Sequence, residues 1–138
     1  MKALTIREPY ATLIKNGIKT IETRSWKTNY RGKIYIHAGV AKLSKEIRDN
    51  NKLMSLINLD ELEYGRIICS CDLVDCILMT DEFIENIKLN KKNEYITGLY
   101  SKGRYAWILK NVKVLDESIP IKGKLGLWNF DCDKGDLK

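Results

Sequence analysis

The chain has 138 residues, of which 44% are hydrophobic and 30% charged, and its formal net charge is +6. These proportions predict one globular domain over residues 1–130, followed by a polar tail over 131–138. No apolar run approaches the roughly 20 residues of a membrane helix, and no hydrophobic leader precedes the first charges. We therefore expect a cytoplasmic protein without a membrane partner.

Several site classes are excluded by what the sequence lacks. A single histidine, His37, excludes two-histidine zinc sites, and there is no Walker or Gly-x-Gly-x-x-Gly loop. No pair of the four cysteines has C-x2-C spacing, which favours reduced, buried thiols over a metal site. We expect no metal and no cofactor.

The positive charge is concentrated in the first third of the chain. Residues 1–48 contain eleven Lys or Arg and three Asp or Glu, whereas the remaining ninety residues contain thirteen and fifteen. A concentrated basic surface attracts phosphate-bearing partners. A Lys-rich composition alone would also give a high isoelectric point.

The N-terminal part alternates in a way that is typical of strands. Residues 2–6, 19–26 and 33–38 show this pattern. Between the first two strands, Pro9 suits the first turn of a helix and Gly17 the position just after its end.

The rest of the chain predicts short elements. In order, they are two short helices within 43–58, a strand over 66–79, a helix capped by Thr80, a polar loop over 88–102, a strand over 104–115 that Pro120 follows as an interruption, and a last strand over 125–130. Strands without regular long helices between them predict an α+β fold. We expect a small, mostly antiparallel β-barrel or curled sheet with three or four short helices.

The segment 17–26 carries the most chemical information. If residues 20–26 form a strand, one face of it carries Thr20, Glu22, Arg24 and Trp26. Lys19, at the turn before the strand, would lean over the same face. Such a set could hold a phosphate by Arg24 and Lys19, and a base by Trp26. An ordinary cross-strand ion pair, with the indole covering the end of the barrel, fits equally well.

Five motifs in order resemble a known family. They are LTIREPYA (4–11), GxKxxExRxW (17–26), RGxIxIHA (31–38), YAWIL (105–109) and PIxGKxGLW (120–128). The set is similar to the activating signal cointegrator homology (ASCH) domain. The resemblance implies a β-barrel like that of the pseudouridine synthase and archaeosine transglycosylase (PUA) domains, with a cleft beside the segment 17–26. It also implies an RNA-related role: binding of RNA, a nucleotide or a nucleoside, with protein partners from a transcription or RNA-processing complex as a further option.

The resemblance also suggests site residues. The expected ligand-binding residues are Arg7, Tyr10, Lys19, Glu22, Arg24, Trp26 and His37. Where relatives often have Gln, this chain has Glu8, which would put a carboxylate near the ligand. A buried His37 bonded to the backbone is the stronger alternative for that residue.

Two other functions stay open at this stage. Some similar proteins are small hydrolases of N4-acetylcytidine or ribonucleases, and here Lys19 and Glu22 would serve as base and acid. The hydrolases are thought to use a Thr at the position of Glu22, and this chain lacks it. A protein-interaction module is the third option. Finally, Tyr95 and Tyr100 lie among lysines in 88–102, a composition that suits either a single-stranded nucleic acid edge or a solvated loop.

Overall fold

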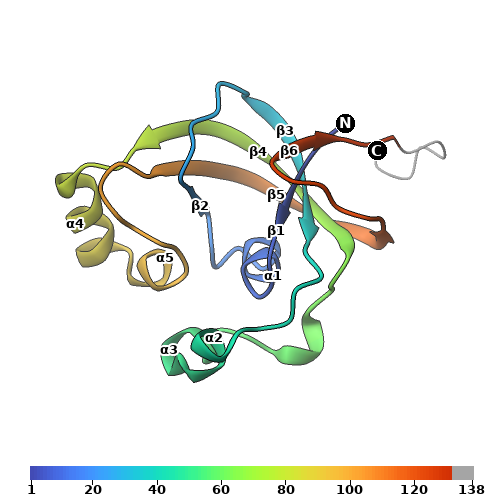
Figure 1. The fold of residues 1–138 in the computed structure, drawn as a ribbon, viewed down its shortest axis with the longest axis horizontal. Helices are drawn as coiled ribbons and strands as arrows, with labels where there is room; N and C mark the ends of the chain where they lie inside the picture. The colour runs from blue at the N-terminus through green and yellow to red at the C-terminus, as the bar shows by residue number, and fades with distance from the viewer. Residues whose placement is uncertain (132–138) are drawn as a thin grey trace.

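Six strands form one curled sheet in the order β2-β5-β4-β3-β1-β6 (Figure 1). A computed structural model describes residues 1–131, so the predicted tail, apart from Asp131, lies outside the described residues. The strands are β1 (Lys2–Ile6), β2 (Ile21–Arg24), β3 (Gly32–Ala38), β4 (Arg66–Leu78), β5 (Tyr105–Pro120) and β6 (Leu127–Asn129). Neighbouring strands are antiparallel except for β1 and β3, which are parallel. This mixed half-barrel confirms the predicted α+β class with a PUA-like curled sheet.

The long strands β4 and β5 bend the sheet. They span 13 and 16 residues and pair with three register shifts. An extra residue in one strand of a pair bends it and increases its twist. The strand predicted over 104–115 is longer than expected: β5 continues to Pro120 and ends there, and this proline pairs with Arg66 at the very end of the ladder. A proline is tolerated there because few ladder bonds remain to be lost.

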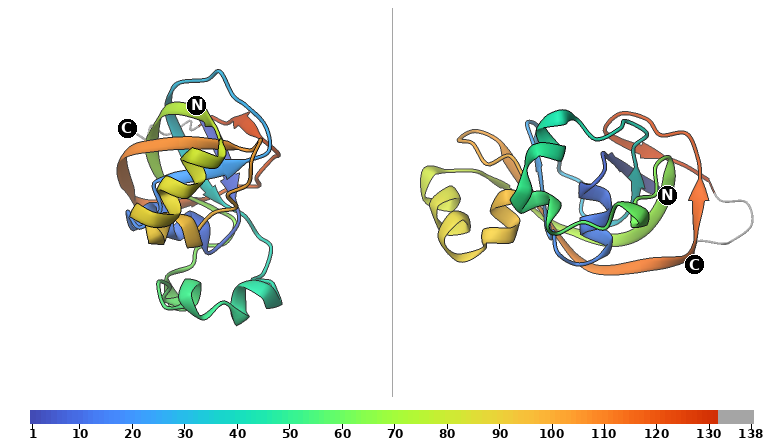
Figure 2. Two further views of the ribbon diagram at one scale, coloured as in Figure 1. Left: turned by 90° about the vertical axis from the view of Figure 1, so that its left-hand side faces the viewer. Right: turned by 90° about the horizontal axis from the view of Figure 1, so that it is seen from below.

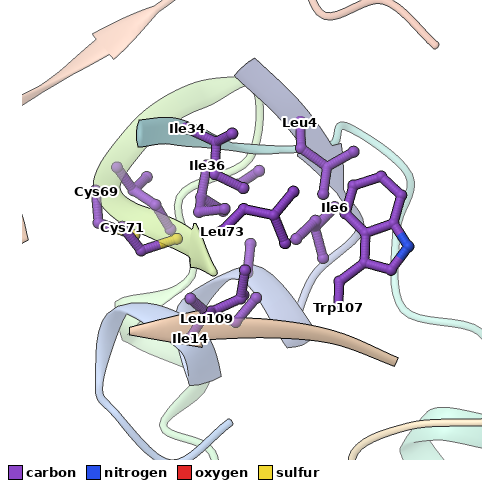
Figure 3. Packing of buried hydrophobic residues seen from close by; sticks show 13 residues of the cluster. Leu4, Ile6, Ile14, Ile34, Ile36, Cys69, Cys71, Leu73, Trp107 and Leu109 are labelled. Carbon is purple, nitrogen blue, oxygen red and sulfur yellow. The ribbon is translucent and has the colours of Figure 1, made fainter. Parts of the chain in front are cut away.

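A cluster of buried side chains packs between the sheet and helix α1 (Tyr10–Lys15) (Figure 3). It includes Trp107, which is fully buried. Cys69 and Cys71 also belong to it, in agreement with the prediction of buried thiols. Burial raises the pKa of both thiols, that of Cys71 to about 12. Both therefore stay protonated and unreactive near neutral pH.

In the view of Figure 1, the other helices lie below the sheet and at one side of it, and Figure 2 shows them from two further directions. They are α2 (Lys45–Asp49), α3 (Asn51–Met54), the 3-10 helix η1 (Leu59–Glu61), α4 (Asp81–Asn90) and α5 (Lys92–Ile96). Thr80 caps α4 as predicted, because its hydroxyl accepts a hydrogen bond from Phe83 N at 3.1 Å. The predicted loop over 88–102 was wrong: it holds the end of α4 and all of α5. No helix within residues 1–131 is long and apolar enough to cross a membrane.

Helix α1 is fixed at both ends by the residues around it. At its start, the buried carboxylate of Glu8 accepts hydrogen bonds from Thr12 N and Thr12 Oγ1, at 2.9 and 2.6 Å. After its end, Gly17 has φ +79°, a conformation that costs other residues about 1–2 kcal/mol. This turn sends the chain towards Lys19 and β2.

Candidate functional site

A cavity of about 830 Å³ lies between the end of β1, strand β2 with the residues on either side of it, and the chain that follows α5. Its volume is in the range of small-ligand sites. The charged side chains that line it are four cations and one carboxylate: Arg7, Lys19, Arg24, Arg104 and Glu22. Tyr10 and Trp26 line it as well. The structure thus brings six of the seven predicted ligand-binding residues around one cavity.

Glu22 joins two of the cations. Its Oε2 atom lies 2.9 Å from both Nε and Nη2 of Arg24, and its Oε1 atom lies 3.6 Å from Lys19 Nζ. Arg24 Nη2 also donates to the carbonyl of Thr5 at 2.9 Å. The hydrogen bonds found within residues 1–131 therefore occupy Nε and Nη2 of Arg24 and leave Nη1 for a ligand.

Lys19 is buried, with 1% of its surface exposed. Its ammonium donates to the carbonyl of Thr97 at 2.6 Å and lies 5.7 Å from the centroid of the Tyr10 ring. Burial lowers the pKa of Lys19, and the carboxylates of Glu22 and Glu94 oppose this shift. The cation is therefore fixed at the base of the cavity, where it is held by neighbouring oxygens.

Helix α5 holds the start of β2 through one carboxylate. Glu94 is buried and accepts hydrogen bonds from Thr20 N, Thr20 Oγ1 and Ile21 N at 2.6–3.1 Å. These bonds turn Thr20 away from the cavity wall on which the strand pattern had placed it. They also explain why a polar segment forms a helix here, since its buried acid has donors to bind. Sequence reasoning did not identify Glu94 because its partners lie more than 70 residues away.

The chain after α5 forms a further part of the cavity wall, next to β2. Leu99 N donates to Thr23 Oγ1 at 3.0 Å, and Arg104 donates to the carbonyls of Leu99 and Thr23 at 3.1 and 3.3 Å. A Cβ atom on Gly98 would come within 2.8 Å of Tyr100 Cε1, so this close approach requires glycine. Arg104 was another site residue that the sequence did not reveal.

Two aromatic side chains and one arginine complete the cavity. Trp26 is 37% exposed and packs edge-to-face on buried Trp107, with ring centroids 4.7 Å apart. Tyr10 is half-buried, and its burial raises the pKa of its phenol, so the hydroxyl stays neutral. Arg7 is exposed, and its side chain makes no hydrogen bond or ion pair within residues 1–131. It is the one cavity cation that can be removed without breaking a contact that holds the fold.

His37 does not line the cavity, so its inclusion among the ligand-binding residues is corrected. The ring is 1% exposed, with Nε2 2.7 Å from the carbonyl of Ile121 and Nδ1 3.2 Å from Thr5 Oγ1. The Nε2–H tautomer donates to that carbonyl and accepts from the hydroxyl. Trp128 Nε1 in turn donates to the same hydroxyl at 3.0 Å. His37 is thus a buried, backbone-bonded residue, the stronger of the two alternatives.

Glu8 does not face the ligand cavity either. Its carboxylate is fully buried and is used by α1 and by Glu63 N, at 2.9 Å. The expected unfavourable charge beside a ligand is therefore absent at this position. Residues 1–131 also contain no group of three or more His, Cys, Asp or Glu side chains that could hold a metal ion.

Comparison with known proteins agrees with this architecture. The ASCH domain family matches residues 4–118, so the chain belongs to this family. It is 29% identical over 135 residues to activating signal cointegrator 1 from Homo sapiens, and 28% identical over 135 residues to that from Mus musculus. Each match covers 93% of this chain but 22% of the relative, so the chain spans about a fifth of these proteins. At the level of the family, the match supports an RNA-related domain.

Proposed function

We propose that this chain binds single-stranded RNA, with one nucleotide seated in the cavity beside β2. One observation carries the proposal: four cations and a single carboxylate line the cavity, together with an exposed indole. Guanidinium groups suit phosphate oxygens, and Arg24 has one nitrogen left for this purpose. A base stacked on Trp26 would contribute roughly 1–3 kcal/mol.

The carboxylate of Glu22 provides a hydrogen-bond acceptor that can recognise a base. Glu22 Oε2 is engaged by Arg24, whereas Oε1 has Lys19 at the longer distance of 3.6 Å. Oε1 can therefore accept an N–H group from a base edge, as carboxylates do in nucleic acid recognition. The same chemistry would serve a free nucleotide, so the length of the ligand must be tested.

Fluorescence anisotropy of a labelled 12-nucleotide RNA, with unlabelled mononucleotide as competitor, tests this proposal. We expect binding that weakens as salt rises from 50 to 200 mM, because cations release counterions from phosphates. Arg7→Ala should reduce the salt slope by about 0.7 and the affinity about fivefold at 0.1 M salt. Arg24→Ala should weaken binding further. The control is Lys110→Ala, at an exposed position on β5, and its effects on affinity and salt slope should be much smaller than those of Arg7→Ala.

Binding that ignores both arginine substitutions would contradict the proposal, as would the absence of any RNA binding by the wild-type protein. Competition by mononucleotide at the same affinity would identify a free nucleotide as the ligand instead of a strand.

One observation favours a second candidate function, hydrolysis of a modified nucleoside. Lys19 has a lowered pKa and lies 3.6 Å from Glu22, an arrangement in which a lysine can accept a proton. Incubation with N4-acetylcytidine, followed by chromatography, tests it. Turnover that disappears in Glu22→Gln, while the variant keeps the wild-type circular dichroism spectrum, would support this candidate. No product at high enzyme concentration would eliminate it for this substrate.

A further inference from the structure

A second groove, of about 480 Å³, lies between α3 and the helix pair α4–α5. Three exposed lysines line it: Lys52, Lys88 and Lys92. No carboxylate is among its lining residues within 1–131. The groove adjoins the cavity, because Ile96 lines both. Cationic surface thus continues from the cavity across the last turn of α5.

The groove beside α5 differs in charge from another hollow on the molecule. Another hollow, of about 620 Å³, is lined by two lysines, Lys33 and Lys113, and also by two carboxylates, Asp116 and Glu117. Charges of both signs cancel there, whereas the groove beside α5 has cations alone. An anionic polymer is therefore favoured in the groove beside α5 and not in the other hollow.

Tyr95 determines what kind of contact this groove can make. Its ring stacks on Tyr100, with centroids 5.7 Å apart and an interplanar angle of 24°, and Lys88 Nζ lies 5.9 Å from its centroid. The ring is therefore occupied by protein contacts and is not free to stack on bases. It holds a lysine in place beside the groove, so the groove offers charge and not a stacking surface.

From these contacts, and resting on the proposed function, we infer that a strand of RNA leaves the cavity past Ile96 and follows this groove with its phosphates beside the three lysines. The protein does not recognise the bases in this part of the strand. The nucleotide in the cavity supplies any selectivity, and the flanking nucleotides add affinity that depends on salt and is independent of sequence.

The expected effect follows from counterion release. Three phosphate contacts to a single strand contribute about 2 to the slope of log affinity against log salt. Their loss should weaken binding about a hundredfold at 0.1 M salt. A ligand too short to reach the groove should show no such loss.

The test compares two triple variants of equal charge by anisotropy. Lys52→Ala/Lys88→Ala/Lys92→Ala removes the groove cations, and Lys33→Ala/Lys110→Ala/Lys113→Ala removes three exposed lysines elsewhere on the sheet. Each is titrated with a labelled 12-nucleotide RNA, a trinucleotide, and a 12-mer that is abasic except for its three central nucleotides. Thermal melts check that both variants fold.

The inference predicts that the groove variant loses about a hundredfold affinity for both 12-mers, keeps its affinity for the trinucleotide, and has a lower salt slope. Equal effects of the two triple variants would overturn it and leave the proposed function standing, as long as Arg7→Ala still weakens binding. A large preference for the 12-mer with bases over the abasic one would also overturn it. Failure of the wild-type protein to bind any of the three RNAs would instead contradict the proposed function, and the inference with it.

Discussion

Replacing Lys19 by Met tests whether the buried cation organises the cavity. Methionine keeps the length of the side chain and removes its charge. The substitution leaves the carbonyl of Thr97 without the donor that now lies at 2.6 Å. Glu22 would still be paired, because Arg24 holds its Oε2 at 2.9 Å.

The size of the effect follows from these contacts. Loss of a hydrogen bond to a charged group, with a buried carbonyl left unpaired, costs about 1.5–3 kcal/mol. Part of this is offset because the methionine has no charge to bury. We expect a net loss of about 2 kcal/mol at pH 7. With an unfolding entropy of about 2.1 cal/mol/K per residue, this corresponds to a decrease in Tm of about 7 °C for this chain.

The pH dependence of the difference in stability between the wild-type protein and Lys19→Met is the sharper test. Burial lowers the pKa of folded Lys19 below the 10.5 of an exposed lysine. Between the folded and unfolded pKa values the unfolded chain binds more protons, so the stability of the wild-type protein rises with pH in this interval. Lys19→Met lacks this titration. The wild-type protein should therefore gain stability relative to the variant as pH rises from 7 to 9.5.

Urea unfolding followed by circular dichroism at pH 7, 8.5 and 9.5 measures both effects. Lys45→Met is the control, because Lys45 is largely exposed and forms a surface ion pair with Asp49. We expect it to change stability by less than about 1 kcal/mol and without this pH trend. A Lys19→Met protein as stable as the wild type, or a difference that shrinks as pH rises, would refute the reasoning.

Three further substitutions test contacts and a turn that hold the fold, each by urea unfolding. Glu94→Gln should destabilise the protein by about 2 kcal/mol, because a neutral amide replaces the charged acceptor that holds the start of β2; an effect below about 0.5 kcal/mol would argue against this role. Gly123→Ala should cost about 1–3 kcal/mol, since its Cβ would lie 2.6 Å from Cε1 of the buried His37 ring. Unchanged stability would mean that the ring can move aside. Gly17→Ala, at φ +79°, should cost about 1 kcal/mol, and a stabilised variant would contradict the strain argument.

The alternating pattern within 17–26 predicted several of the residues that line the cavity. Alternation places Glu22, Arg24 and Trp26 on one face, and the turn after Gly17 sends Lys19 to the same place. These positions depend on local geometry, which is why they could be read from the residues. The curled sheet followed in the same way from the periodicity of the other strands.

The missed features depend on contacts between distant segments. Glu94 and Arg104 contribute to the site through partners more than 70 residues away in sequence, and nothing around either residue signals this. Helix α5 was mistaken for a loop because its segment is polar, although burial of Glu94 against β2 stabilises it. His37 followed a strand pattern that suits a cleft, but the residue after β5, Ile121, covers it with a carbonyl.

The three tryptophans allow the most direct test of ligand binding in the cavity. Each indole N–H gives one resonance in a ¹⁵N-edited NMR spectrum, and Trp26 alone of the three lines the cavity. On titration with a short single-stranded RNA, the account predicts that the Trp26 resonance shifts most, that Trp107 follows weakly because it donates to the Trp26 carbonyl at 3.4 Å, and that Trp128 stays in place. Saturable RNA binding with an unmoved Trp26 resonance would contradict the assignment of this cavity as the RNA site.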